Sequence, residues 1–277
     1  MQRLLVAGFG DIARRAAPAL TSRFAITALS RETGFELDAT SSPALAPTDA
    51  LLHCVPPPSH GDVDTRTAHL LAALDASHVV PRRFVYISTS GVYGDCAGAR
   101  VDESWPRQPH TARAKRRADA EVQLERWCAA HAVALVILRA PGIYASDRLP
   151  LERLRARLPV LQAADDVYTN HIHAQDLAAS VVRALQSDAP AGIYNAADDS
   201  ELRMGDWLDL VADYARLPRP ARVARERLAD LVPPAALSFM SESRRLDNAR
   251  LKQVLGVRLL YPTVREGLAH EHALGVH

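Results

Sequence analysis

Two glycines near the start of the chain have the spacing of a phosphate-binding turn. Gly8 and Gly10 follow a short apolar run, and apolar residues with helical spacing begin at Ile12. Gly8 permits a tight turn, and Gly10 has no side chain to block the approach of a pyrophosphate. Small Ala13 lets the helix pack closely on the strand, and the free N–H groups at the helix start favour an anion. The sequence therefore predicts that a dinucleotide pyrophosphate binds at Gly8, Phe9, Gly10, Asp11 and Ile12.

A hydroxyl and a guanidinium stand where the second strand is expected to end. The apolar run at residues 24–29 delivers Ser30 and Arg31 to this point. In a dinucleotide-binding fold the tip of the second strand meets the adenosine ribose, where an acidic side chain binds the 2′-hydroxyl of NAD. Ser30 and Arg31 suit a 2′-phosphate instead, which favours NADP. Glu32 or Asp38 could still serve NAD, so NAD stays as the alternative.

A sheet of parallel strands is expected to position these residues. Helical spacing at residues 67–77 and 113–131 alternates with short apolar runs. Such alternation is typical of an α/β fold with a doubly wound parallel sheet and right-handed crossovers. The buried strands are expected at residues 4–7, 24–29, 50–55, 83–89 and 133–138.

Two of these strands add residues to the expected cofactor site. The strand at 50–55 stops at three prolines, which give a stiff, extended loop without N–H donors. Because ligands of this fold bind at the carboxyl ends of the strands, we expect that loop to line the cofactor crevice near the adenine. The strand at 83–89 ends at the same edge. The cofactor site therefore also includes Val55, Pro56, Pro57 and Ser88.

The alternation changes after Pro141, where a second unit is expected to begin. Residues 1–145 are predicted to form an NAD(P)-binding Rossmann domain, and residues 146–277 a small C-terminal α/β substrate lobe. Residues 168–195 are expected to return to the Rossmann sheet. The helices and the strand expected after Pro141 lie at 149–158, 176–185, 192–196, 204–215 and 247–255.

Composition and charge exclude several classes of function. The 277 residues are 48% hydrophobic, enough for a full core, and the net charge of +1 argues against nucleic acid or an anionic membrane as a partner. No apolar stretch is long enough to span a bilayer, and a strand expected from residue 3 leaves no room for a signal peptide. Cys54, Cys96 and Cys128 are odd in number and scattered, as expected of reduced cysteines in a cytoplasmic protein.

Neither a metal site nor a serine hydrolase site is expected. His171 and His173 share one face of an extended segment, but zinc normally takes three or four ligands and no third ligand lies near in the sequence. Ser90 is followed by Gly91 without the Gly-x-Ser-x-Gly turn of the α/β hydrolases.

Several phrases occur in a fixed order along nearly the whole chain: Gly8-Phe9-Gly10, residues 85–94, residues 138–144, residues 170–178 and residues 192–195. Together they resemble the extended or atypical short-chain dehydrogenase/reductases, the NAD-dependent epimerase/dehydratase family. The resemblance implies hydride transfer with a nicotinamide cofactor and a small polar substrate, such as a sugar nucleotide, held between the sheet and the lobe. It also implies a monomer or a homodimer formed through helices flanking the sheet, such as 113–131.

The resemblance implies three catalytic side chains. One is a serine or threonine that hydrogen-bonds the substrate oxygen, and Thr89 matches it. The others are a tyrosine acid/base and, four residues later, a lysine that lowers the tyrosine pKa, because a nearby cation favours the phenolate. This pair should open the helix that is expected to start near residue 111.

The segment at residues 111–121 departs from that pattern. Anchoring on Glu121 places Arg113 and Arg117 at the tyrosine and lysine positions, whereas anchoring on Lys115 places Thr111 at the tyrosine position. Neither alignment gives a tyrosine. An arginine stays protonated and does not replace a phenol as an acid/base.

Two interpretations of the missing tyrosine stay open. In the first, the chain is an NAD(P)-dependent oxidoreductase or epimerase/dehydratase-type enzyme in which Tyr93 or Tyr144, both expected at strand ends, moves the proton. In the second, it is a catalytically silent NAD(P)-binding sensor or regulatory protein, with the cations of the helix contacting ribose or phosphate. The candidate catalytic residues are Thr89, Tyr93, Lys115 and Arg113.

Overall fold

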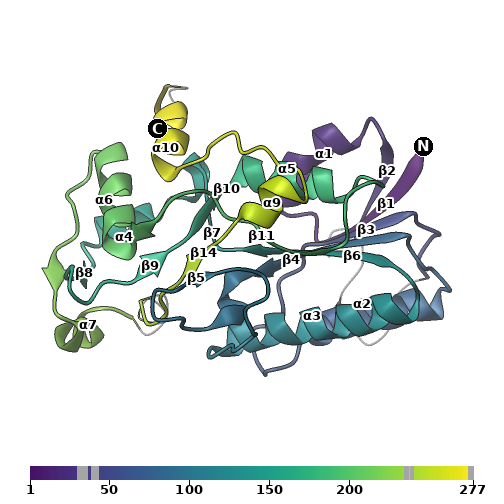
Figure 1. Cartoon of the computed structure of the whole chain (residues 1–277), viewed down its shortest axis with the longest axis horizontal. Helices are drawn as coiled ribbons and strands as arrows, with labels where there is room; N and C mark the ends of the chain where they lie inside the picture. The colour runs from purple at the N-terminus through teal and green to yellow at the C-terminus, as the bar shows by residue number, and fades with distance from the viewer. Residues whose placement is uncertain (30–36, 39–43, 234–236, 238–239, 274–277) are drawn as a thin grey trace.

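The computed structural model describes residues 1–29, 37–38, 44–233, 237 and 240–273 (Figure 1). Its centre is a six-stranded sheet with the order β2-β1-β3-β4-β6-β11, in which every neighbouring pair is parallel. The predicted doubly wound α/β Rossmann fold is therefore confirmed. The strands are β1 (Gln2–Ala7), β2 (Phe24–Leu29), β3 (Ala50–His53), β4 (Arg83–Thr89), β6 (Ala134–Ala140) and β11 (Gly192–Asn195).

Helices cover both faces of this sheet because its strands carry apolar side chains on both. Leu4 and Val6 pack in the cluster formed with α1 (Asp11–Leu20) and α5 (Ala174–Ala184). Leu5 and Ala7, which alternate with them, pack in the cluster formed with α2 (Thr65–Ala76) and α3 (Ala112–Ala130). Figure 1 shows α2 and α3 together on one side of the sheet and α1 and α5 on the other.

The chain reverses its direction of winding at β1. β2 lies on one side of β1 and β3 on the other. The first turn of α1, which follows β1, and the loop that follows β3 therefore meet at the carboxyl edge of the sheet. Ligands of open α/β sheets bind at such a switch point. The topology therefore assigns the candidate site to the loops following β1, β3 and β4.

A lobe lies beside the sheet, at the end of the molecule opposite β1 and β2 (Figure 1). Its helices α4 (Leu151–Arg155), α6 (Met204–Tyr214) and α10 (Val264–Ala273) enclose a separate apolar cluster that includes Trp207. A second small cluster involves α7 (Arg225–Leu231). The described residues also form four two-stranded pairs: β5 (Arg100–Val101) with β14 (Arg245–Leu246), β7 (Gly142–Tyr144) with β10 (His171–His173), β8 (Val160–Leu161) with β13 (Arg222–Val223), and β9 (Tyr168–Thr169) with β12 (Leu202–Arg203).

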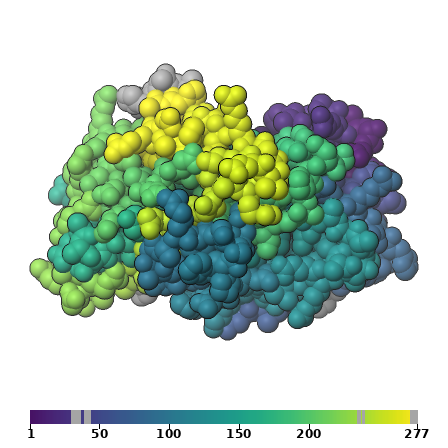
Figure 2. All heavy atoms as spheres, in the orientation of Figure 1, coloured from purple at the N-terminus to yellow at the C-terminus, as the bar shows by residue number. Residues whose placement is uncertain are grey.

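The C-terminal segment joins the two parts. Helix α9 (Ala249–Gln253) packs on β11 of the main sheet, and α10 packs on α6 and β10. Figure 2 shows this segment, in yellow, covering the surface between the lobe and α5. Within the described ranges, no helix has the length and apolar character needed to cross a membrane.

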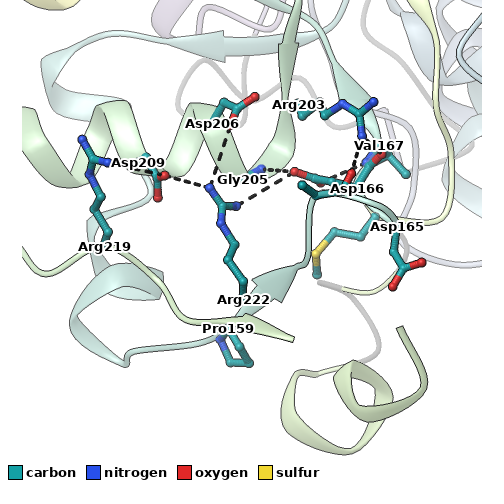
Figure 3. A network of polar contacts seen from close by, with 12 residues as sticks. Pro159, Asp165, Asp166, Val167, Arg203, Gly205, Asp206, Asp209, Arg219 and Arg222 are labelled. Carbon is teal, nitrogen blue, oxygen red and sulfur yellow. Dashed lines mark hydrogen bonds and ion pairs between the residues drawn. The ribbon is translucent and has the colours of Figure 1, made fainter. Parts of the chain in front are cut away.

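An ionic network fixes the start of α6 in the lobe (Figure 3). Asp166 accepts a hydrogen bond from the backbone N–H of Gly205 at 2.9 Å, and Arg222 pairs with Asp209 at 2.7 Å. A Cβ on Gly205 would lie 1.3 Å from the Nη1 atom of Arg222, so the guanidinium occupies the place of a side chain. The lobe therefore holds its central helix with charged groups as well as an apolar core.

Some element boundaries differ from those expected. The helix expected at 149–158 spans only Leu151–Arg155, because Arg157 has a φ of +52° that a right-handed helix cannot continue. The strand expected at 50–55 ends at His53, three residues before the first proline. Helix α5 begins at Ala174, two residues before the expected start.

Candidate functional site

The turn between β1 and α1 has the geometry of a pyrophosphate-binding loop. Gly8 has a φ of +86°, and a Cβ there would lie 2.9 Å from the backbone N and Cγ2 of Val55. Gly10 precedes the first turn of α1, and a Cβ on it would meet no protein atom within 4 Å. Phe9 and Ile12 pack against the apolar cluster beneath. The side chains thus point inward, while the backbone N–H groups at the start of α1 stay open to an anion.

Asp11, also expected at the cofactor, belongs to a network of ion pairs. Its carboxylate lies 2.8 Å from Arg15 Nε and 2.9 Å from Arg148 Nη1. Arg15 in turn pairs with Asp147 at 2.7 Å. The two arginines offset the charge of Asp11, which would otherwise repel a phosphate at this helix start. The network also ties α1 to the turn after β7.

The loop after β3 is held in place by one arginine. Val55 contacts the turn at Gly8, as described above, and Arg66 donates to the carbonyls of Pro56 at 2.9 Å and Pro57 at 3.4 Å. Ser30 and Arg31, expected at the adenosine ribose, lie outside the described residues. The geometry therefore fixes the pyrophosphate end of the candidate cofactor site.

A cavity of about 510 Å³ lies at the carboxyl ends of β4 and β6. It is enclosed by the turn after β4, the first turns of α3, the β6–β7 segment and residues of the lobe. Its walls include Thr89, Thr111, Arg113, Arg117, Tyr144, Arg148, Tyr168, Asn170, His171, Trp207, Glu242 and Arg244. Arg148 also pairs with Asp11, so the cavity adjoins the pyrophosphate turn.

The two hydroxyl residues at the end of β4 differ in their orientation. Thr89 is half-buried at the cavity, and its Oγ1 accepts a hydrogen bond from the N–H of Gly91 at 3.3 Å. The Thr89 hydroxyl proton is therefore available to another acceptor. Ser88 also lines the cavity, but its hydroxyl donates to the buried carboxylate of Glu121 at 2.6 Å.

The two candidate tyrosines occupy different environments. Tyr93 is fully buried and absent from the cavity wall, and its hydroxyl donates to Asn195 Oδ1 at 2.7 Å. Burial raises the pKa of Tyr93 to about 12. Tyr144 lines the cavity and donates to the carbonyl of Thr263 at 3.3 Å, and burial raises its pKa as well. Of the two candidates, Tyr93 therefore has a structural contact, and Tyr144 lies at the cavity.

Helix α3 turns two arginines toward the cavity. Arg113 and Arg117, one helical turn apart, both line it. Lys115 does not, because its ammonium lies 3.4 Å from Asp62. Of the two alignments, the one anchored on Glu121 therefore matches the face of the helix at the cavity.

Other cavity residues could not be assigned to the site from the sequence. Arg244 and Glu242 pair at 2.6 Å, and the ring of Trp207 lies 4.3 Å from that of His171. Burial lowers the pKa of His171 to about 3, so its imidazole is uncharged at neutral pH. The signal that could have pointed to this wall is the position of these residues in and near the phrases of the family resemblance. Among the described residues, no cluster of three metal ligands occurs.

Beneath the cavity lies a buried ionic network. Glu121 has no exposed surface, and its carboxylate accepts from Arg139 Nη2 at 2.7 Å and Arg107 Nη1 at 3.1 Å. The Arg139 guanidinium lies 4.7 Å from the centre of the Tyr93 ring. This network fixes α3 against β4 and β6, and so sets the position of the two cavity arginines.

Comparisons with known proteins agree with this architecture. The chain is 29% identical to a functionally unknown conserved protein from Silicibacter pomeroyi over 99% of both chains, with a TM-score of 0.82. A structure of RMD from Pseudomonas aeruginosa complexed with NADPH has a TM-score of 0.75, with 19% identity over 100% of this chain and 99% of that one.

A human dTDP-D-glucose 4,6-dehydratase is 27% identical over 159 residues, which cover 47% of this chain and 45% of the relative. The match thus spans less than half of that relative's length. Residues 63–197, which contain β4, α3 and β11, match the sequence model of the NAD dependent epimerase/dehydratase family. In these residues, just under half of the chain, the chain is therefore similar to that family.

Proposed function

We propose that this chain binds a nicotinamide dinucleotide and acts as an oxidoreductase or an epimerase/dehydratase-type enzyme on a small polar substrate. The observation that carries the proposal is the continuity between the pyrophosphate turn and the cavity. Arg148 lines the cavity and pairs with Asp11 in the first turn of α1 at 2.9 Å. A dinucleotide lying on the turn would therefore have its reactive end near the cavity.

The residues of the turn fit such a cofactor. Gly10 leaves the space outside the start of α1 unobstructed, and Val55 with Pro56 and Pro57 forms the neighbouring wall. The N–H groups at the start of α1 would hold the pyrophosphate. When bound, the nicotinamide would supply a hydride donor or acceptor.

The chain's own residues would orient the substrate and hold the proton. The Thr89 hydroxyl, whose oxygen already accepts from Gly91, would donate to the reacting oxygen. Of the two candidate tyrosines, Tyr144 lines the cavity, and its raised pKa keeps the proton on the phenol oxygen. We therefore propose Tyr144 ahead of Tyr93 as the proton donor.

A catalytically silent nucleotide-binding sensor is the second candidate function. It is favoured by one observation, the presence of arginines at both α3 positions that face the cavity. Those arginines would still contact ribose or phosphate, but neither can exchange a proton near neutral pH.

A titration separates these functions from a chain that binds no cofactor. NADPH and NADH would be added to the purified protein while energy transfer from Trp207 and the other tryptophans to the nicotinamide is followed. We expect binding of at least one nucleotide in the micromolar range. Failure of both to bind would contradict both functions, whereas binding without turnover across carbonyl and sugar-nucleotide substrates would favour the sensor.

We propose NADP as the preferred cofactor, because Ser30 and Arg31 suit a 2′-phosphate. Arg31→Ala should weaken the affinity for NADPH by about 10-fold, because one charged hydrogen bond is lost. The affinity for NADH should stay within about 2-fold of the wild type. Equal weakening of both nucleotides would contradict the assignment.

The setting and assembly of the protein are proposed on the same footing. Cys54, Cys96 and Cys128 carry free thiols, which suits the reducing cytoplasm. We propose a domain boundary near residue 145, where the chain leaves β7 for the lobe, and a monomer or a homodimer formed through α3. Light scattering at several concentrations would distinguish the two states.

A further inference from the structure

Two arginines in the first turns of α3, Arg113 and Arg117, line the cavity. We propose that Arg113 and Arg117 make this part of the cavity a receptor for an anionic group of the substrate, a carboxylate or a phosphate. This inference rests on the proposed function, since the substrate would lie in the same cavity. It adds a feature of this chain, because arginines stand where the family resemblance implies a tyrosine and a lysine.

Arg117 is held in place by uncharged groups. It donates to the hydroxyl of Tyr86 at 2.9 Å and to the carbonyl of Ile87 at 3.0 Å, and its guanidinium lies 5.6 Å from the Tyr86 ring centre. These contacts fix the direction of the side chain without neutralising its charge. A positioned guanidinium with remaining N–H donors binds carboxylate or phosphate oxygens well.

The rest of the cavity wall gives a local excess of positive charge. Among the described residues of the wall, four arginines stand against one carboxylate, that of Glu242. Arg244 pairs with Glu242 at 2.6 Å, and Arg148 pairs at 2.9 Å with Asp11, which lies outside the wall. Desolvation lowers the pKa of Arg113, and repulsion by the charges of Arg117 and Arg116 lowers it further, whereas Glu242 raises it. An anion between the two arginines would relieve this repulsion.

The opposite wall has a different character. The rings of His171 and Trp207 lie 4.3 Å apart, and the ring of Tyr144 packs edge-on against that of Trp207 at 5.7 Å. His171 is uncharged at neutral pH because burial lowers its pKa to about 3. The cavity is therefore cationic at α3 and aromatic at the lobe. It suits a small anion that also carries a flat or apolar part.

Two probes with a common ring test this inference. Benzoate and phenyl phosphate present a carboxylate and a phosphate on the same phenyl group, and benzyl alcohol is the neutral counterpart. Calorimetric titration of the NADPH-saturated protein should show binding of at least one anion, tighter than that of benzyl alcohol. The tighter of the two anions identifies the group that the arginines recognise.

Arg113→Gln should weaken the affinity for the anion by about 10-fold to 100-fold, because it removes a charge-assisted hydrogen bond. The matched control is Arg126→Gln, which makes the same change on an exposed arginine of α3 away from the cavity. The control should stay within about 2-fold of the wild type, since distant exposed charges are screened by salt. Circular dichroism would check the folding of both variants, and Arg113→Lys should restore part of the affinity.

Equal effects of the two glutamine substitutions, or equal affinity for benzyl alcohol and both anions, would overturn the proposal. So would the absence of anion binding up to millimolar concentrations. The titration with NADPH alone is a separate readout. Cofactor binding without anion binding contradicts only this inference, whereas anion binding at Arg113 without cofactor binding contradicts only the proposed function.

Discussion

The pyrophosphate turn and the cavity wall on α3 are built by opposite means. The turn presents backbone and has its side chains turned inward: Gly10 leaves open space, and Phe9 and Ile12 pack on the core. The wall is formed by long side chains of a helix, those of Arg113 and Arg117. A backbone site can keep its function while most side chains around it change. A side-chain site changes its chemistry with each substitution, which explains why the departure from the family pattern falls on α3.

The largest effect is expected from the buried base of the side-chain site. Glu121→Gln should reduce the free energy of unfolding by about 3–5 kcal/mol, because it leaves the buried Arg139 guanidinium without its charged partner. Urea denaturation followed by circular dichroism would measure the loss. Glu125→Gln is the control, since Glu125 pairs with the same Arg107 near the surface at 2.9 Å and should cost at most about 1 kcal/mol. Equal losses in the two variants would show that Glu121 does not anchor α3.

The turn should respond in its binding rather than in its stability. Gly10→Val should weaken NADPH and NADH by at least roughly 100-fold, because a branched side chain would occupy the space that the pyrophosphate needs. The extended backbone of Gly10 tolerates valine, so the free energy of unfolding should fall by no more than about 1 kcal/mol. The titration described above measures binding. Gly10→Ala should give an intermediate loss, and unchanged affinity in the valine variant would remove the turn from the cofactor site.

A pH measurement probes the junction between the sheet and the lobe. Asp198 follows β11, and burial raises its pKa from 3.8 to about 8. The folded chain therefore holds a proton that the unfolded chain releases, and this stability is lost as pH rises between about 4 and 8. Asp198→Asn mimics the protonated form. It should match the wild type near pH 4 and exceed it at pH 8 by at least about 1 kcal/mol, the value of one pKa unit.

Urea denaturation across this pH range measures the difference between Asp198→Asn and the wild type. A constant difference in the free energy of unfolding at all pH values would contradict the assignment, because the difference depends on pH only if Asp198 takes up a proton in the folded chain. Asp199→Asn is the matched control. Its carboxylate pairs at the surface with Lys252 at 2.7 Å, and the substitution should give a small loss without this pH dependence.

The parts of the structure that depend on local sequence were predictable. The strand bounds 24–29 and 83–89 agree with the structure, since an apolar run buried on both faces of a parallel sheet leaves a continuous signal. The strands of the lobe were harder to predict from the sequence because they are two or three residues long. Val160 and Leu161, for example, pair with a segment about 60 positions later, and such a short strand has no detectable period.

The site divides in the same way. Gly8 and Gly10 could be identified from spacing, because the turn needs them in order along the chain. Tyr93 was expected at the reaction centre from its place after β4, but its hydroxyl contacts Asn195, a residue 102 positions away. No local pattern reveals such a partner. Arg113 and Arg117 were identified as candidates, and their direction became clear only with the packing of α3.

The smallest effect is expected at Tyr93, where the comparison of the two tyrosines can be tested. Tyr93→Phe removes the hydrogen bond to Asn195 and should cost about 1 kcal/mol of stability. Because its ring is outside the cavity wall, cofactor affinity and turnover should stay within about 2-fold of the wild type. Tyr144→Phe should instead lower kcat by about 100-fold or more if the protein is an enzyme, since it removes the proposed proton donor. Turnover that survives Tyr144→Phe and fails in Tyr93→Phe would return the proton donor to Tyr93, and would mean that the buried phenol becomes accessible when substrate binds.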